Sequence, residues 1–253
     1  MKTHMIKSAL FTVGLSALMA CNQGTSKTEK IEETNTKTES KVEQKSVMEI
    51  AIRRVKVGQD SEFVNARTAF IKRLKDQNGI EKDWEFKSFF TMPEPDETDV
   101  FVGMTRYESA EAMQEIANNL MQSPEAGKFF GTFDMKAFLA IQPADGGDFK
   151  LEDYIKSGNN VLEVAVRTVK EGNEGEYDAK RKAFFDLIAQ QKGYIFDREF
   201  TDLQTGDKVV LIGWKSMEDF QKGAGFLQTQ AQMGEFFGIL NVKAYQALVL
   251  SSN

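Results

Sequence analysis

Histidine and cysteine are almost absent from this 253-residue chain, which has one His, at position 4, and one Cys, at position 21. A single cysteine allows no intrachain disulfide, so the fold must rest on its own core. His4 falls in a segment that we interpret below as a cleaved signal, which leaves the mature chain without imidazole. This excludes a histidine haem ligand, a histidine general base and nearly all transition-metal sites, so we expect no metal and no cofactor.

Basic clusters are missing as well. The net charge is −6, and no run of Lys and Arg is interleaved with aromatic residues, so nucleic acid is not an expected partner. Proline is scarce, with four residues, whereas phenylalanine is abundant, with 20. A chain of this length and composition can bury a substantial hydrophobic core.

The N-terminus carries an apolar segment that is too short to span a membrane. Lys2 and Lys7 come first, and an apolar stretch over residues 9–20 has the length of a signal-peptide core. It ends in Leu-Met-Ala-Cys, which resembles the lipobox of bacterial lipoproteins. In that family the cysteine is lipidated and becomes the first residue of the mature protein. An ordinary secretory signal followed by an unrelated cysteine is the alternative.

The lipoprotein resemblance implies a signal peptide over residues 1–20 and a lipid-bilayer partner through acylated Cys21. Residues 22–46 contain no aromatic residue and nearly balanced Lys and Glu, so we expect a disordered tether. Asn22, rather than Asp, follows the cysteine, and no compact acidic cluster comes after it. We therefore expect a lipid anchor in the outer membrane with the protein facing the periplasm.

The rest of the chain contains one domain twice. Residues 47–86 align with residues 161–200 without a gap, and 16 of the 40 positions are identical. The end of each copy is also similar: the first contains GKFFGTFDMKAFLAI and the second contains GEFFGILNVKAYQAL. A period of this length suits one small domain rather than a solenoid unit. We place the first repeat at 47–145, a linker at 146–160 and the second repeat at 161–253.

Each repeat reads as β-α-β-β-α-β. In the first, apolar residues alternate over 48–53, then follow helical spacing from Gln59 to Gln77, with strands near 82–91, 101–104 and 134–142. Serines open the second helix of each repeat, at 109 and 216. Gly79 and Gly193 suit left-handed caps of the first helices. The linker contains a short helical stretch near Leu151–Lys156.

The predicted fold class is therefore α+β, with two ferredoxin-like repeats that pair their bare sheet faces in an intrachain pseudodimeric barrel. This order of elements, with the last strand after the GKFFG and GEFFG segments, resembles the dimeric α+β barrel superfamily and its antibiotic-biosynthesis-monooxygenase-like domains. Ordinary members pair two chains to close the barrel, so we expect a monomer here. Haem-degrading members use a histidine ligand, which the mature chain would lack once His4 is removed with the signal peptide.

One Glu–Arg pair occurs in each repeat, at equivalent positions. Glu49 and Arg53 lie four residues apart on one face of a strand, and Glu163 and Arg167 repeat them. Arg67 and Arg181 fall on the apolar side of their helices, where a guanidinium needs a carboxylate or a polar cavity. A structural ion pair is one interpretation. The other is an anion-binding or oxyanion-stabilising group in a ligand cavity between helices and sheet.

The resemblance also suggests a catalytic set. Cofactor-independent monooxygenases of this superfamily are thought to use Asn, Trp and Arg around an aromatic acidic substrate, and Asn65, Arg67 and Trp84 would supply these types in the first repeat. The second repeat keeps only the arginine, so one half at most would hold such a site. Trp214 has no tryptophan equivalent; we match it to Met104 and count it as a further ligand-binding candidate. The alternative is that both tryptophans simply fill the core.

Two functions from different classes remain open. In the first, the protein is a membrane-anchored module whose barrel binds a small apolar or aromatic ligand, or a partner protein. In the second, it is a cofactor-independent monooxygenase acting on phenolic or quinone-like compounds. The missing histidine and the unequal halves favour the first function, which is our prediction. The second rests on the fold resemblance, and fold alone does not carry function.

Overall fold

The structure is a computed structural model that describes residues 45–252. The predicted signal peptide, Cys21 and residues 22–44 of the predicted tether lie outside the described residues. The elements follow one another in the order β1-α1-β2-β3-α2-α3-β4 and then β5-α4-β6-β7-α5-α6-β8. We call the two groups the first half (47–143) and the second half (161–252).

The strands are β1 (Val47–Val55), β2 (Ile80–Met92), β3 (Val100–Tyr107), β4 (Phe133–Pro143), β5 (Val161–Val169), β6 (Tyr194–Asp202), β7 (Lys208–Trp214) and β8 (Leu240–Ser252). The α-helices are α1 (Asp60–Lys75), α2 (Ala110–Leu120), α3 (Pro124–Phe130), α4 (Tyr177–Ala189), α5 (Met217–Leu227) and α6 (Ala231–Gly238). Two short 3-10 turns complete the fold, η1 (Leu151–Asp153) and η2 (Glu174–Glu176).

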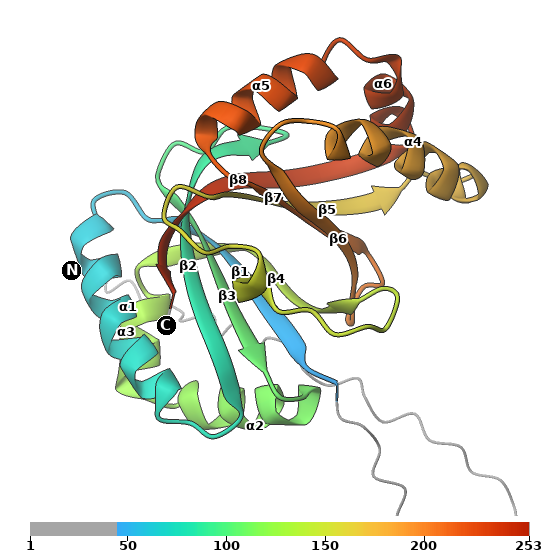
Figure 1. Cartoon of the computed structure of the whole chain (residues 1–253). Coiled ribbons are helices and arrows are strands. Elements are labelled where there is room, and N and C mark those ends of the chain that lie inside the picture. The colour runs from blue at the N-terminus through green and yellow to red at the C-terminus, as the bar shows by residue number, and fades with distance from the viewer. Residues whose placement is uncertain (1–44, 253) are drawn as a thin grey trace, which may run out of the picture. The chain divides into compact units, whose positions relative to one another are not determined.

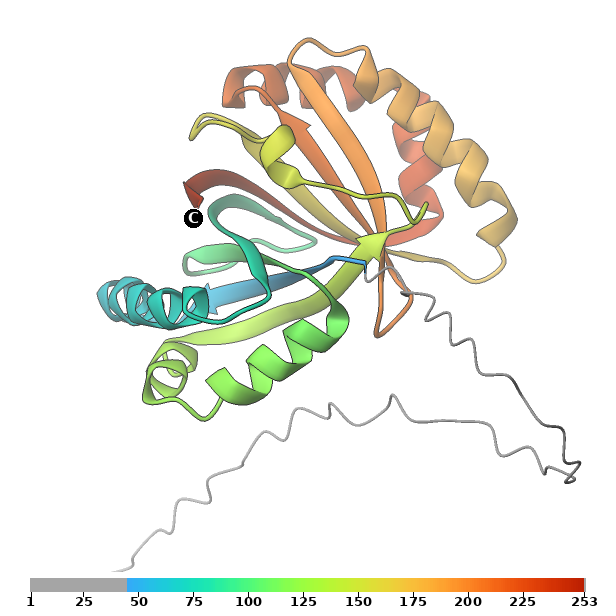
Figure 2. The ribbon, with the colours of Figure 1, turned by 60° about the horizontal axis from the view of Figure 1, so that its bottom comes forward.

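The strands form one closed barrel in the order β1-β3-β2-β8-β5-β7-β6-β4, and all neighbours are antiparallel. Within it, β4-β1-β3-β2 and β8-β5-β7-β6 are the two half-sheets. A long pairing of β2 with β8 and a short one of β4 with β6 join them. The helices lie outside the barrel, α1–α3 against the first half-sheet and α4–α6 against the second (Figure 1; Figure 2). The expected mixed α+β barrel is confirmed.

Apolar side chains fill the inside of the barrel. Alternation along β1 turns Ile50 and Ile52 inward, and both are fully buried. Trp84 and Phe86 of β2 and Leu162 of β5 join the same core cluster, so both halves contribute to it. The interior is therefore a shared hydrophobic core, as is usual for small barrels.

The linker between the halves takes part in this core. Leu151 is fully buried, and Phe149 and Ile155 pack beside it among the barrel residues. Arg106 of β3 holds the linker in place, because its guanidinium binds both oxygens of Glu152, at 2.8 and 2.7 Å. The expected short helix near Leu151–Lys156 is present as the three-residue turn η1.

The helix ends agree in part with the sequence. The backbone N–H of Ala112 donates to Ser109 Oγ at 3.1 Å, and that of Asp219 donates to Ser216 Oγ at 3.2 Å, so both predicted serine caps are confirmed. Gly79 and Gly193 have the positive φ expected of them, 94° and 81°. They are not the helix caps, however. α1 ends at Lys75 and α4 at Ala189, and the glycines form the turns into the next strands.

Helices α3 and α6 were not predicted. Each follows a longer helix after a break of three residues and presents a buried phenylalanine, Phe129 or Phe236, to the sheet. In the part of the chain that the structure describes, no helix is long and apolar enough to cross a membrane.

Candidate functional site

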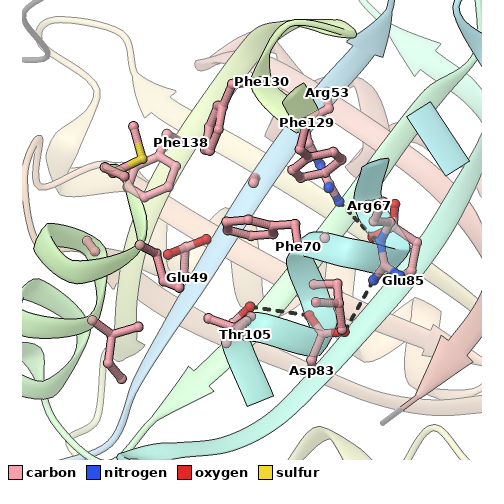
Figure 3. Close-up of a pocket in the computed structure, with 18 of the residues that line it drawn as sticks. Glu49, Arg53, Arg67, Phe70, Asp83, Glu85, Thr105, Phe129, Phe130 and Phe138 are labelled. Atoms are coloured by element: carbon pink, nitrogen blue, oxygen red, sulfur yellow. Dashed lines mark hydrogen bonds and ion pairs between the residues drawn. The ribbon is translucent and has the colours of Figure 1, made fainter. Parts of the chain in front are cut away.

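A small pocket lies between the first half-sheet and its helices. Because side chains alternate along β1, Glu49, Ala51 and Arg53 point away from the barrel interior and toward α1–α3. The cavity has a volume of about 100 Å³, and every residue that lines it belongs to the first half (Figure 3). The structure therefore brings Glu49, Arg53 and Arg67, three of the predicted ligand-binding residues, to one cavity.

The wall of the pocket is mostly apolar and rich in aromatic rings. Its phenylalanines are Phe70, Phe129, Phe130, Phe133 and Phe138. Three lining side chains are partly exposed, Met121 (53%), Met135 (39%) and Phe138 (37%), and they mark the opening toward solvent. This cavity is smaller than the dry apolar cavity of about 150 Å³ that accommodates benzene, so a bound aromatic ring would reach into the opening toward solvent. The pocket suits a small aromatic or apolar group.

The arginines at this pocket are already paired with carboxylates. Arg67 Nε lies 2.7 Å from Glu85 Oε2, and Arg67 Nη2 lies 3.2 Å from Asp83 Oδ2. Arg53 Nη2 donates to the same Glu85 oxygen at 2.7 Å (Figure 3). Arg53, Asp83 and Glu85 are each at most 4% exposed. Buried charges are tolerated when paired in this way, so these contacts support the structural interpretation of Arg67.

Glu49 is the lining carboxylate that no arginine binds directly. It is half-buried, and the hydroxyl of Tyr107 donates to its Oε2 at 3.0 Å. Within residues 45–252, no group donates a hydrogen bond to its other oxygen, Oε1. Burial raises the pKa of the Glu49 carboxyl from 4.5 to about 7, although the Tyr107 hydrogen bond and the charge of Arg53 act in the opposite direction. Glu49 can therefore hold or release a proton near neutral pH.

The second half repeats the ion pairs. Arg181 Nη2 lies 2.9 Å from Asp197 Oδ2, and Arg181 Nε lies 2.8 Å from Glu199 Oε2. Asp83 and Glu85 of the first half align with these two carboxylates without a gap. This identity between the two repeats is a signal in the sequence that our prediction did not use. It would have named the partners of both arginines.

The other second-half candidates are buried against the sheet. Glu163 accepts a hydrogen bond from Gln246 at 2.8 Å, and burial raises the pKa of its carboxyl. Arg167 is 1% exposed, and its guanidinium lies 5.1 Å from the ring centroids of both Phe185 and Phe236. Burial lowers the pKa of Arg167. None of these residues lines the pocket of the first half.

The strand registers explain why the halves differ. Val47 pairs with Tyr107 and Val161 with Trp214, so Tyr107 and Trp214 hold equivalent positions. The sequence match of Trp214 to Met104 was therefore wrong. The cause is that the second half is shorter here: β6 has 9 residues against 13 in β2, and the connection that follows runs over 203–207 instead of 93–99.

With this register, the small and polar pocket residues Gly103, Thr105 and Tyr107 correspond to Val210, Ile212 and Trp214. The three second-half residues are at most 3% exposed and belong to one packed hydrophobic cluster beneath α4–α6. Trp214 lies over Gly223, where an added Cβ would stand 2.6 Å from its ring. Large apolar side chains thus occupy the space beneath the second set of helices.

The predicted catalytic set is not brought together. Asn65 lies on the exposed side of α1, whereas Arg67 faces the sheet. Trp84 is fully buried in the barrel core, between Asp83 and Glu85, which face the helices. The sheet itself separates Trp84 from Arg67, so Trp84 is a core residue. Trp214 is likewise core, on the helix side of the second half-sheet.

Sequence reasoning missed Thr105 and Tyr107, which supply hydroxyl groups to the pocket. Thr105 Oγ1 lies 3.4 Å from Asp83 Oδ1. Alternation along β3 was the available signal, since these residues share a face with Gly103. Within residues 45–252 no group of three or more Asp, Glu, His or Cys side chains is arranged to hold a metal ion.

No family model and no curated protein matches the sequence. Solved structures do match the fold. A candidate monooxygenase from Fusobacterium nucleatum subsp. nucleatum is 12% identical with a TM-score of 0.55, over 83% of this chain and 94% of that one. An anthrone oxidase-like protein is 10% identical with a TM-score of 0.57, over the same shares. A candidate chlorite dismutase is 8% identical with a TM-score of 0.56, over 82% and 96%.

At these identities the likeness establishes the fold alone. This chain shares its α+β barrel fold with these structures, and all eight strands come from one polypeptide. Proteins that share such a barrel differ in chemistry, so the function must be argued from the site.

Proposed function

We propose that this protein binds a small aromatic or apolar molecule in the pocket of its first half. The observation that carries the proposal is the cavity of about 100 Å³ with its phenylalanine-rich wall and its opening between Met121, Met135 and Phe138. Pockets of this kind, mostly apolar with few polar groups, are the usual binding sites for small molecules.

A pocket-filling variant tests this proposal. Thr105→Ile introduces the residue that the second half carries at the same register position, Ile212. We expect this variant to stay folded and to lose the binding of small aromatic probes such as toluene, followed by ligand-observed NMR. Thr68→Ile, on the exposed side of α1, is the matched control and should bind as the wild type does. Unchanged binding in Thr105→Ile would place the ligand elsewhere.

We also propose that the barrel is an internal pseudodimer of two ferredoxin-like repeats and that the protein is a monomer. The repeated order of elements, the matching half-sheets β4-β1-β3-β2 and β8-β5-β7-β6, and the shared ion pairs of Arg67 and Arg181 support this. Light scattering after size exclusion measures the mass directly. A particle of two chains would contradict the proposal.

The location of the protein is a proposal that rests on the sequence. Leu18-Met19-Ala20-Cys21 supports lipidation of Cys21 and anchoring in the outer membrane, facing the periplasm. In the native host, we expect wild-type protein in the membrane fraction with acyl chains on Cys21 by mass spectrometry. Cys21→Ser should appear in the soluble fraction. A membrane-bound Cys21→Ser protein would show that another feature anchors it.

A second candidate function is cofactor-independent monooxygenation of phenolic or quinone-like compounds. The observation that favours it is Glu49, a carboxyl that titrates near pH 7 inside an aromatic pocket, in a barrel that also occurs in an anthrone oxidase-like protein. Oxygen consumption with a panel of phenols and hydroquinones decides between the two functions. Binding without consumption identifies a binding module, whereas turnover that Glu49→Gln abolishes identifies an enzyme.

A further inference from the structure

Glu49 is the polar group of the pocket that is placed to meet a ligand. Arg53 and Arg67 both pair with Glu85 Oε2, and Thr105 faces Asp83. Glu85 Oε1 accepts no hydrogen bond either, but this oxygen is fully buried. In Figure 3 Glu49 lies on one side of Phe70, and the Arg67–Glu85 ion pair lies on the other. The carboxylate thus stands at the aromatic part of the cavity, apart from the buried ion pairs.

The position of Glu49 is fixed by one hydrogen bond. The Tyr107 hydroxyl donates to Oε2 at 3.0 Å, and Tyr107 itself is 4% exposed, so this donor is held in place by packing. The hydrogen bond leaves Oε1 without a donor among residues 45–252. Glu49 Oε1 is not among the fully buried atoms that lack a partner, so it keeps accessible surface at the cavity, where a ligand O–H could donate a hydrogen bond to it.

We propose that Glu49, positioned by Tyr107, accepts the hydroxyl proton of a small neutral hydroxyaromatic ligand in this pocket. The inference rests on the proposed ligand-binding function and specifies its ligand class. The ligand O–H donates to Oε1 of the carboxylate. In full transfer the O–H bond breaks, its electron pair stays on the ligand as aryloxide, and the proton forms the O–H bond of neutral Glu49. No oxidant or other co-reactant is required.

The charges around Glu49 set when it can act. Arg53 on β1 and the Tyr107 hydroxyl on β3 favour the carboxylate, whereas Asp83 on β2 and burial oppose it. Arg67 on α1 and Glu85 on β2 largely cancel, because they are paired. The acceptor form therefore appears as the pH rises through the neutral range.

The test compares phenol with toluene, two probes of similar size of which one carries a hydroxyl. The free phenol stays neutral below about pH 9, as a tyrosine side chain does. Affinities of the full chain for both probes are measured by NMR titration from about pH 5 to about pH 8.5. We expect phenol to bind roughly tenfold more tightly at the upper pH than at the lower, because a charged acceptor strengthens its hydrogen bond, while toluene changes little.

Three variants test the separate contributions of Glu49 and Tyr107 to phenol binding. Glu49→Gln should lose both the pH dependence and the preference for phenol. Tyr107→Phe removes the hydrogen bond that lowers the pKa of Glu49, so the same rise in phenol affinity should occur at higher pH. Glu163→Gln changes the matching glutamate of the second half, which lies outside the pocket, and should leave both probes unaffected.

The outcomes separate this inference from the proposed function. The role of Glu49 would be overturned if toluene and phenol bound with equal affinity at every pH, or if the pH dependence of phenol binding persisted in Glu49→Gln. In either case the proposed binding pocket would still stand. Failure of both probes to bind the wild type would overturn the pocket and the inference together.

Discussion

The guanidinium of Arg53 occupies the space that Gly103 leaves open on the neighbouring strand. A Cβ built on Gly103 would overlap Nη2 of Arg53, the atom that donates to Glu85 at 2.7 Å. In the second half the register places Val210 at the Gly103 position. The absence of a side chain at residue 103 is therefore a condition for the buried ion pair beneath α1.

This relationship predicts the effect of Gly103→Val. The valine would displace Arg53 and leave buried charges without partners, so we expect the free energy of unfolding in urea to fall by about 3 kcal/mol. Gly225→Ala is the control, because no atom lies within 4 Å of a Cβ added in α5. Alanine there should raise the stability by up to about 1 kcal/mol. A Gly103→Val protein as stable as wild type would mean that Arg53 moves away without cost.

Replacement of Arg67 or Arg181 by alanine tests whether the ion pairs that occur in both halves are structural. Each substitution strips a partner from two carboxylates beneath a helix, and we expect losses of about 2–4 kcal/mol in both cases. Lys182→Ala breaks only an exposed pair with Asp186 and should change stability by less than about 0.5 kcal/mol. Lost ligand binding in Arg67→Ala with wild-type stability would instead support a ligand role.

The raised pKa of Glu49 predicts a pH-dependent stability. Below about pH 4.5 the carboxyl is protonated in both the folded and the unfolded chain. Between pH 4.5 and pH 7 the unfolded chain loses this proton first, so the free energy of unfolding decreases as the pH rises. The decrease is at most about 3 kcal/mol, and smaller to the extent that solvent reaches the carboxylate.

Glu49→Gln should abolish this decrease, so the variant should be more stable than wild type above pH 7 and similar to it near pH 4.5. Urea unfolding at a series of pH values measures the difference. Other raised carboxyls, such as Glu163, contribute equally to both proteins and cancel in the comparison. A stability difference that does not vary with pH would contradict the raised pKa.

The linker provides the last prediction. Leu151 is fully buried in the barrel core, and its replacement by alanine should cost about 2–5 kcal/mol in thermal or urea unfolding. Leu203→Ala makes the same chemical change at a side chain that is 48% exposed, and we expect little effect. Equal effects at the two positions would show that the linker does not pack into the barrel.

The sequence allowed most of the barrel to be predicted, because the signals were local or repeated. Alternation over 48–53 and helical spacing from Gln59 to Gln77 correspond to β1 and α1. α3 and α6 escaped detection because a helix of seven or eight residues is too short to show a period. The register of Trp214 was also not predicted, since the shortening of β6 and of the connection before β7 leaves no trace in β7 itself.

The site was harder to predict than the fold. Arg67 and Arg181 lie on the apolar side of their helices, so the sequence showed that they need carboxylate partners. It did not show that Asp83 and Glu85 are the partners of Arg67, because that depends on which face of β2 meets α1. The location of Trp84 also depends on which face of β2 carries it. The sequence placed Trp84 on a strand, but it did not show that the side chain lies inside the barrel. Tyr107 became part of the site only through its pairing across β1.

One polypeptide supplies all eight strands of this barrel, and this has a consequence for how the site can change. In a barrel assembled from two identical chains, any substitution appears on both sides of the symmetry axis at once. Here Val210 can differ from Gly103, and Trp214 from Tyr107, although each pair holds equivalent register positions. The second half can therefore remain rigid and well packed, while substitutions in the first half change the pocket and the molecule that it binds.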